Sequence, residues 1–148
     1  MRSPDSSRRQ FLTAGVCLGC ALAVSGCEQS LEPEVPRRIE LAPLDSLHEP
    51  RTIFALEKLV VFRQRDSIGV MSMNCTHQSC LLTPLENGDE GYRCNCHESS
   101  FDIQGRVLRG PATRDLPWYA AEIDGQRMLV VDLSHEVSKE WRLNVGAA

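Results

Sequence analysis

The chain has 148 residues, with 16 Lys and Arg against 20 Asp and Glu, and its formal net charge at pH 7 is −4. Nucleic-acid binding needs a clustered basic surface, and this composition does not indicate one. The length allows one compact domain with its own hydrophobic core, even after an N-terminal targeting segment is subtracted. We therefore expect a single, slightly acidic domain whose partners are not nucleic acids.

The first 26 residues have the composition of an export signal. Arg8 and Arg9 precede an apolar stretch over residues 11–24, which is too short to be assigned as a membrane span. Residues 7–12, SRRQFL, resemble a twin-arginine motif, and such signals export proteins that have already folded. An ordinary secretory signal with two adjacent arginines is the alternative. Either signal predicts export to the bacterial cell envelope, at the periplasmic face of the inner membrane.

A candidate lipid-attachment site follows this signal. Residues 24–27, VSGC, resemble a bacterial lipobox, so Cys27 is the expected lipid-modified residue at the mature N-terminus. The alternatives are an uncleaved signal that serves as the membrane anchor and an unmodified Cys27. Residues 27–40 are mostly polar and contain two prolines, which predicts a tether between the membrane and the folded domain.

Residues 41–148 form the expected folded domain, and their pattern is typical of β-strands. Short apolar runs bounded by charged residues predict strands over residues 51–56, 58–63 and 68–73, with a hairpin turn over residues 64–67. Two further strands, over residues 91–94 and 101–108, are expected to frame the loops described below.

The C-terminal part predicts one more hairpin. Strands over residues 118–123 and 127–133 flank Asp124-Gly125, a pair that favours a tight primed turn. Residues 134–140, beginning at Ser134, predict a helical turn. Residues 141–145 predict a last strand or a packing tail.

Four cysteines and two histidines stand in two short segments whose composition favours turns over helices. They are Cys75, His77 and Cys80 in the first segment, and Cys94, Cys96 and His97 in the second. Thiolates and imidazoles are good ligands for zinc and iron. Two of each could form a closed tetrahedral zinc site or a Rieske [2Fe–2S] centre, in which two histidines replace two cysteines on one iron. Zinc fingers usually place both histidines on a helix, whereas each segment here supplies one Cys–His pair.

The chain resembles the Rieske iron–sulfur protein family in these segments. The strings CTHQSC and CNCHESSFD are similar to the two cluster-binding loops of that family, and GRVLRGPA is similar to the segment that follows them. The resemblance covers roughly residues 40–133. It implies an all-β fold, namely a small antiparallel Rieske-type domain with two cluster-binding loops at its tip.

The resemblance also implies the ligands of one [2Fe–2S] cluster per chain. Cys75 and Cys94 match the ligands of the inner iron. His77 and His97 match the ligands of the outer iron, which lies nearer to solvent. Residues 110–112 match a proline-containing loop that covers the cluster from a third side, although a simple turn between strands is the alternative.

The two remaining cysteines, Cys80 and Cys96, match a pair that forms a disulfide between the loops. This pair is typical of the high-potential cytochrome bc-type branch of the family. Two free buried thiols are the alternative. The oxidising compartment implied by the export signal makes the disulfide chemically reasonable.

Residues around the loops are expected to tune the reduction potential. Ser99 matches a serine that donates a hydrogen bond to a bridging sulfide, whereas Phe101 stands where the high-potential branch often has a tyrosine donor. Because phenylalanine cannot donate, we expect a potential below that of members with both donors. Glu98, next to His97, adds negative charge that opposes reduction unless solvent screens it.

These observations predict a protein that carries single electrons and has no catalytic residues of its own. It would be a membrane-tethered, exported Rieske protein that serves a periplasmic oxidoreductase as its small subunit, as in arsenite oxidase, or acts as a stand-alone carrier. The Rieske subunit of a quinol–cytochrome c reductase is the alternative. A zinc-stabilised lipoprotein without a redox role is an alternative of another class. The expected partners are electron donor and acceptor proteins or quinol, and the membrane through the lipid or signal anchor.

Overall fold

A computed structural model describes residues 37–85 and 90–146 of the chain. Within these ranges the regular structure is β, apart from one short 3-10 segment, η1 (Leu44–Ser46), so the expected all-β class is confirmed. The described residues contain no helix that is long and apolar enough to cross a membrane. The expected signal over residues 1–26, the candidate lipidation site Cys27 and the tether up to residue 36 lie outside the described residues.

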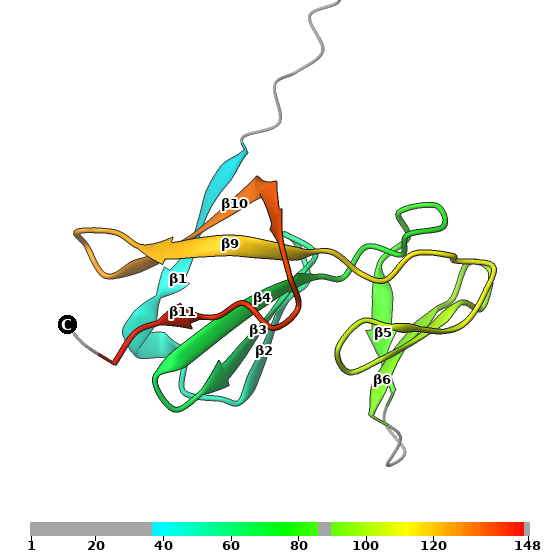
Figure 1. Ribbon diagram of the computed structural model, residues 1–148, viewed down its shortest axis with the longest axis horizontal. Helices are drawn as coiled ribbons and strands as arrows, with labels where there is room; N and C mark the ends of the chain where they lie inside the picture. The colour runs from blue at the N-terminus through cyan, green and yellow to red at the C-terminus, as the bar shows by residue number, and fades with distance from the viewer. Residues whose placement is uncertain (1–36, 86–89, 147–148) are drawn as a thin grey trace, which may run out of the picture. The chain divides into compact units, whose positions relative to one another are not determined.

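The strands of the described residues form two antiparallel sheets (Figure 1). In chain order they are β1 (Arg38–Pro43), β2 (Arg51–Phe54), β3 (Leu59–Gln64), β4 (Ser67–Ser72), β5 (Leu82–Pro84), β6 (Gly91–Cys94), β7 (Ser100–Asp102), β8 (Val107–Arg109), β9 (Trp118–Ile123), β10 (Met128–Val137) and β11 (Leu143–Asn144). The larger sheet has the order β1-β10-β9-β4-β3-β2, and β11 pairs with β4. The smaller sheet has the order β5-β6-β7-β8.

Strand β3 is buried on both of its faces, because the larger sheet borders two hydrophobic cores. On one face, Val61 packs in a core with Leu129 of β10. On the other face, Val60 packs in a core that also contains Met71 of β4 and Phe101 of the smaller sheet. Successive strand residues point to opposite faces, so a continuous apolar run such as Leu-Val-Val is what two cores require. The second core joins the two sheets.

Gly105, in the turn between β7 and β8, permits a close approach between this turn and β4. Its φ is +81°, and a Cβ atom here would lie 2.6 Å from Sδ of Met71 and 2.8 Å from Cβ of Leu116. An L-residue would therefore clash with packed side chains and also adopt an unfavourable backbone conformation. Glycine at this position lets the smaller sheet pack against the larger one.

Two expected hairpins form, but one has a different turn. The hairpin at residues 64–67 is confirmed, with Gln64 paired to Ser67. The β9–β10 hairpin also forms, but its connection spans residues 124–127, and Arg127 rather than Gly125 has a positive φ, of +62°. A side-chain oxygen of Asp124 accepts the N–H groups of residues 126 and 128 and so shapes the loop. The expected tight primed turn at Asp124-Gly125 is therefore wrong.

The expected helical turn over residues 134–140 is also wrong, because β10 continues to Val137. The pairing between β10 and β9 shifts register between Asp132 and Glu136, which leaves residues 133–135 as a bulge. One Asp132 oxygen accepts both the N–H and the hydroxyl of Ser134. Serine thus acts in a bulge here and not as a helix cap, and β9 provides the pairing partners that extend the strand.

Other expected strands differ in extent. The expected strand over residues 101–108 is two strands, β7 and β8, because a side-chain oxygen of Asp102 accepts the N–H groups of Gln104 and Arg106 and forms a turn. Strand β1 begins at Arg38, within the last residues of the expected tether. Strand β5 has no counterpart among the expected strands, and β11 lies within the expected final segment over residues 141–145.

Candidate metal centre

The two segments with cysteine and histidine are loops attached to different sheets. The first loop follows β4 of the larger sheet, and an isolated β-bridge between Asn74 and Leu81 closes it. Within it, the N–H of Ser79 donates to the carbonyl of Cys75 (2.8 Å), and the N–H of Cys75 donates to the carbonyl of Cys80 (2.8 Å). Ser79 is left-handed, with a φ of +55°. These bonds fix a tight turn that begins at Cys75.

The second loop, which joins β6 to β7 of the smaller sheet, repeats this turn. The N–H of Glu98 donates to the carbonyl of Cys94 (2.9 Å), and the N–H of Cys94 donates to the carbonyl of Ser99 (2.8 Å). Glu98 is left-handed, with a φ of +62°. Cys75 and Cys94 therefore occupy equivalent positions, each at the start of its turn and each immediately at the end of a packed strand region.

Cys75 and Cys94 are the buried members of the predicted ligand set. Both thiols are free, both residues are 1% exposed, and both belong to the core that joins the two sheets. Burial pushes the pKa of the Cys94 thiol upward, but the N–H of Cys96, the Cys75 thiol and the N–H of His97 outweigh it and lower that pKa. A thiolate is the form that binds metal, and the two backbone N–H groups can stabilise the Cys94 thiolate even when Cys75 is also deprotonated.

His77 and His97 are the exposed members of the predicted ligand set. They come from different loops, yet their ring centroids lie only 4.8 Å apart, with the ring planes at 90°. Neutral imidazoles are good ligands for iron. The structure therefore brings the two imidazoles together and places the two free thiols in the core that joins the two sheets. Two thiols and two imidazoles are the donor types that a Rieske [2Fe–2S] cluster requires.

A disulfide links the two loops through Cys80 and Cys96, with an S–S distance of 2.06 Å. This is the pairing that the family resemblance implies. The sulfur atoms of Cys80, Cys94 and Cys96 lie within 4.8 Å of one another. Since two of these sulfurs are bonded to each other, Cys94 alone among the three can offer a thiolate to a metal. The disulfide therefore braces the two loops and leaves Cys75 and Cys94 as free thiols.

The segment after β8 contacts both loops and forms a third side of the site. The N–H of Ala112 donates to Oγ of Ser99 (3.0 Å), and both residues are buried. The hydroxyl of Thr76 donates to the carbonyl of Arg114 (2.6 Å). Because Oγ of Ser99 accepts from Ala112, its own proton is left for an acceptor on another side. That is compatible with the tuning role expected of Ser99.

Phe101 is fully buried in the same core as the two free cysteines and has no group that could donate a hydrogen bond. Its partner across the β6–β7 pairing is Tyr92, which is also fully buried. The Tyr92 hydroxyl lacks a hydrogen-bond partner of normal geometry among the described residues. Burial raises the pKa of Tyr92, and the Arg51 guanidinium opposes that rise. Tyr92 was not expected at the site, although its alternation with Cys94 in β6 could have indicated it.

Glu98 does not present an uncompensated charge beside His97. Nη2 of Arg93 donates to Oε1 of Glu98 at 2.6 Å, and both side chains are about half exposed to solvent. The sequence alone suggested only the acidic partner of this pair. Arg93 could have been recognised as the basic partner, because it is exposed in β6 between the buried residues Tyr92 and Cys94.

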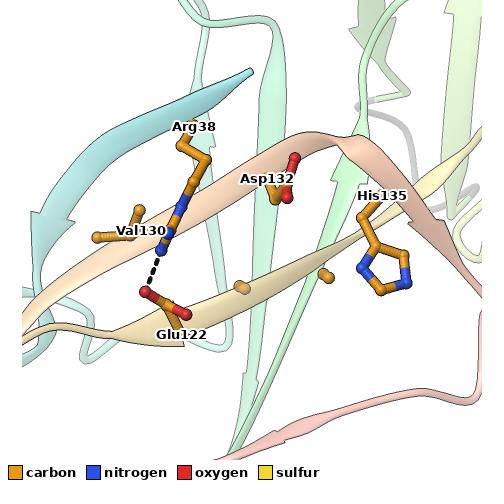
Figure 2. A pocket seen from close by; sticks show the side chains of 7 residues that line it. Arg38, Glu122, Val130, Asp132 and His135 are labelled. Carbon is orange, nitrogen blue, oxygen red and sulfur yellow. Dashed lines mark hydrogen bonds and ion pairs between the residues drawn. The ribbon is translucent and has the colours of Figure 1, made fainter. Parts of the chain in front are cut away.

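A separate hollow of about 160 Å³ lies on the larger sheet, between β1, β9 and β10 (Figure 2). Figure 2 shows its lining, in which Arg38 donates to Glu122 while Asp132 and His135 stand nearby. The Ser134 hydroxyl lowers the pKa of Asp132 by donating to it. None of the described residues that line this hollow belongs to the two loops with cysteine and histidine.

The comparison with protein families agrees with the donor set. The Rieske [2Fe-2S] domain model matches residues 38–120, which is more than half of the chain, so the chain belongs to the Rieske [2Fe–2S] domain family. Its cofactor is a Rieske [2Fe–2S] cluster, which overturns the zinc alternative. Two cysteines and two histidines from two loops, with a separate disulfide, fit this cofactor.

Curated relatives and a solved structure extend the comparison. The chain is 25% identical to a cytochrome b6-f complex iron-sulfur subunit of Chlorobaculum thiosulfatiphilum over 144 residues, or 88% of this chain and 78% of the relative. It is 39% identical to the same subunit of Synechococcus sp. (strain JA-3-3Ab) over 54 residues, or 36% and 31%. The cyanobacterial plasma membrane Rieske protein PetC3 from Synechocystis PCC 6803 is 26% identical, with 63% of this chain and 97% of that chain covered and a TM-score of 0.44. The family assignment therefore depends on the sequence match and not on this structural likeness.

Proposed function

We propose that the protein is a membrane-tethered, exported Rieske protein that carries single electrons, either as the small subunit of a periplasmic oxidoreductase or as a stand-alone carrier. The observation that supports this proposal best is that two of the predicted ligands are buried and two are exposed. Cys75 and Cys94 are buried and would hold the inner iron, whereas His77 and His97 are exposed and would hold the outer iron. Exposed ligands give a redox partner direct access to one side of the cofactor.

When bound, the cluster supplies one-electron chemistry at a potential that two neutral imidazoles raise above that of all-cysteine clusters. The protein's own residues hold and shield it. The core behind Cys75 and Cys94 excludes water from the sulfur side, the Cys80–Cys96 disulfide braces the loops, and residues 110–112 cover a third side. Water and partners therefore meet the site at the two imidazole rings.

The proposed potential lies below that of relatives with two hydroxyl donors. The Ser99 hydroxyl is oriented by Ala112 and keeps a proton to donate, whereas Phe101 has none. Hydrogen bonds to cluster sulfurs stabilise the added electron, so loss of one donor lowers the potential. The Arg93–Glu98 pair offsets the charge of the carboxylate next to His97, so Glu98 contributes little to this effect.

The test of this function is spectroscopic and chemical. The exported protein should contain about two iron atoms and two acid-labile sulfides per chain, and its reduced form should give the EPR spectrum of a Rieske centre. A redox titration of the same sample gives the potential. Iron without acid-labile sulfide, or a reduced sample without this EPR signal, would end the electron-carrier proposal.

The proposed membrane attachment needs a separate experiment, because it depends on Cys27. Wild-type protein should fractionate with membranes and incorporate a radiolabelled fatty acid, whereas Cys27→Ser should lose the label. If the wild-type protein stays with the membrane but carries no label, the uncleaved signal is the anchor. If both proteins are soluble in the periplasmic fraction, the tether proposal is wrong.

A second candidate function is the Rieske subunit of a quinol–cytochrome c reductase. The observation in its favour is that the relatives named above are subunits of cytochrome b6-f complexes. The exposed polar residues near the imidazoles, Gln78, Ser79 and Glu98, favour a protein partner instead. Quinol-dependent cytochrome c reduction that is lost on deletion of this chain, and that quinol-site inhibitors block, would select the quinol function.

A further inference from the structure

We propose that the side of the metal centre formed by residues 108–114 is the docking surface for a redox partner with an acidic face. This inference rests on the electron-carrier function proposed above and specifies the kind of protein that exchanges the electron. We call the surface the arginine rim, and its members are Leu108, Arg109, Pro111 and Arg114. All four are exposed.

The backbone attaches one arginine of the rim to each loop of the metal centre. Arg109 pairs with Ser100 across β7 and β8, and Ser100 directly follows Ser99 of the second loop. The carbonyl of Arg114 accepts the hydroxyl of Thr76, which directly precedes His77 in the first loop. Arg109 and Arg114 therefore lie on either side of Ala112 in the chain, each tied through its backbone to a residue that neighbours one of the two loops.

Neither arginine of the rim has an ion-pair partner within residues 37–85 and 90–146. Among the described residues, the ion pairs are Arg38–Glu122, Arg93–Glu98 and Arg127–Asp45. None of them involves Arg109 or Arg114. Exposed, unpaired guanidinium groups keep their full attraction for carboxylates on another protein.

Nearby carboxylates are already engaged with the protein. One oxygen of Asp102 accepts two N–H groups of the β7–β8 turn, and one oxygen of Asp115 accepts the N–H of Val107. Arg93 offsets Glu98. These hydrogen bonds orient Asp102 and Asp115 but leave their charges in place. Residues 100–117 contain three arginines against these two aspartates, so the net charge of the segment is +1.

The rim also offers apolar contact area. Leu108 is 65% exposed and directly precedes Arg109, and Pro111 is exposed between the two arginines. Arginines beside apolar side chains are typical of protein–protein interfaces, where arginine is enriched. An acidic partner could therefore place carboxylates against the guanidinium groups and an apolar side chain against Leu108.

The charge of this surface is positive, whereas the net charge of the whole chain is negative. A net charge of −4 would attract a basic partner if the charge were evenly spread. Charges beyond about 10 Å of a contact are largely screened at moderate ionic strength. The charge of the rim therefore determines whether a partner that docks beside the imidazoles is attracted or repelled. For an acidic partner and for a basic partner, we expect the rate of electron transfer to change in opposite directions as salt is added.

Two inorganic oxidants of opposite charge test the local sign. Reduced holoprotein is mixed with excess hexacyanoferrate(III), an anion, or with tris(phenanthroline)cobalt(III), a cation, and each molecule of oxidant accepts one electron. We expect the rate constant with the anion to fall as salt is added, and the rate constant with the cation to rise. The double variant Arg109→Gln/Arg114→Gln should slow the anion reaction about threefold at low salt and flatten its salt dependence.

The matched control is Arg37→Gln/Arg65→Gln, which removes two exposed arginines and changes the net charge equally. Arg37 directly precedes β1, and Arg65 lies in the turn between β3 and β4. It should leave the anion reaction unchanged. EPR spectra and potentials of all variants should match the wild type, because none of these residues is a proposed ligand. A missing cluster signal would contradict the proposed function, whereas a normal cluster with reversed salt dependence, or an equal effect of the control, would overturn the arginine rim alone.

Polyanions provide a model of an acidic protein surface. Added polyglutamate should compete at the rim and slow the hexacyanoferrate(III) reaction of wild-type protein, but not that of the Arg109→Gln/Arg114→Gln variant. Polylysine should not slow the wild-type reaction. Inhibition by polylysine would assign the surface to a basic partner, and no inhibition by polyglutamate would remove the support for an acidic one.

Discussion

The two loops of the metal centre share a backbone turn but use its positions differently. Both begin with a buried cysteine and both place a left-handed residue four positions later. The residue after that is Cys80 in the first loop, which bonds covalently to the second loop, and Ser99 in the second, which accepts a hydrogen bond from Ala112. The shared turn positions a thiol, and the residue five positions after that cysteine makes a different contact in each loop. Cys80 bonds to the other loop, whereas Ser99 holds its loop to the segment after β8.

The largest expected effect is loss of the cluster, and it should be equal for the two loops. Cys75→Ser and Cys94→Ser should each abolish the cluster, because both thiols occupy equivalent buried positions and serine is a poor ligand for this iron. Iron analysis and EPR of the purified proteins measure the loss. His48→Ser, an exposed histidine outside the loops, is the control and should retain the cluster. Retention of a normal cluster in either cysteine variant would disprove the equivalence.

Removal of the disulfide should lower the free energy of unfolding without removing any predicted ligand of the cluster. The double variant Cys80→Ser/Cys96→Ser opens a link across 16 residues, and such a loop stabilises a fold by about 3 kcal/mol. Denaturant unfolding of the holoprotein measures the change in free energy of unfolding. The four ligands remain, so the cluster should assemble but be lost faster under denaturing conditions. An unchanged unfolding midpoint would show that packing alone holds the loops together.

The hydrogen bond that secures the second loop should matter less than the disulfide. Ser99→Ala leaves the N–H of Ala112 buried without its partner, which costs about 1–3 kcal/mol. The same variant should lower the reduction potential, because it removes the hydroxyl donor. Thr76→Ala, which removes a hydrogen bond of the first loop to the same third segment, is the comparison and should leave the potential unchanged.

Phe101→Tyr tests the missing donor without a large effect on stability. The new hydroxyl should raise the reduction potential if it reaches a ligand sulfur. Redox titration followed by EPR measures the shift, and Phe101→Leu controls for changes in packing. An unchanged or lower potential in the tyrosine variant would refute the assigned tuning role of this position.

The smallest expected effect concerns the left-handed residues of the two turns. Ser79→Gly should increase the free energy of unfolding by about 1 kcal/mol, because glycine adopts a positive φ without steric cost. Glu98→Gly should gain less, since it also removes the exposed ion pair with Arg93. Thermal unfolding of both variants measures the difference. A larger gain at Glu98 would mean that the ion pair is itself unfavourable.

Sequence patterns predicted those features that depend on local periodicity or on residue chemistry. The strands around residues 60 and 70 and the two loops follow from apolar runs and from the cysteine and histidine spacing. The pairing of Cys80 with Cys96 came from the family resemblance, because spacing alone does not determine disulfide connectivity.

Sequence patterns could not predict the features that depend on strand register. The contact of Arg93 with Glu98 and the position of Tyr92 opposite Phe101 require knowledge of how β6 folds back against its neighbours. The extension of β10 was missed because Ser134 and its polar neighbours favour a helix start locally, whereas β9 provides backbone partners from elsewhere in the chain. Tertiary pairing determined the outcome in both cases.

The bulge at residues 133–135 of β10 offers a practical site for protein engineering. The backbone ladder already skips these residues, so an insertion beside the exposed His135 would lengthen an existing irregularity and preserve the register on either side. A short peptide tag placed there would tie the protein to an electrode through the larger sheet. Neither cysteine-containing loop would be altered, and direct voltammetry could then be recorded on the immobilised chain.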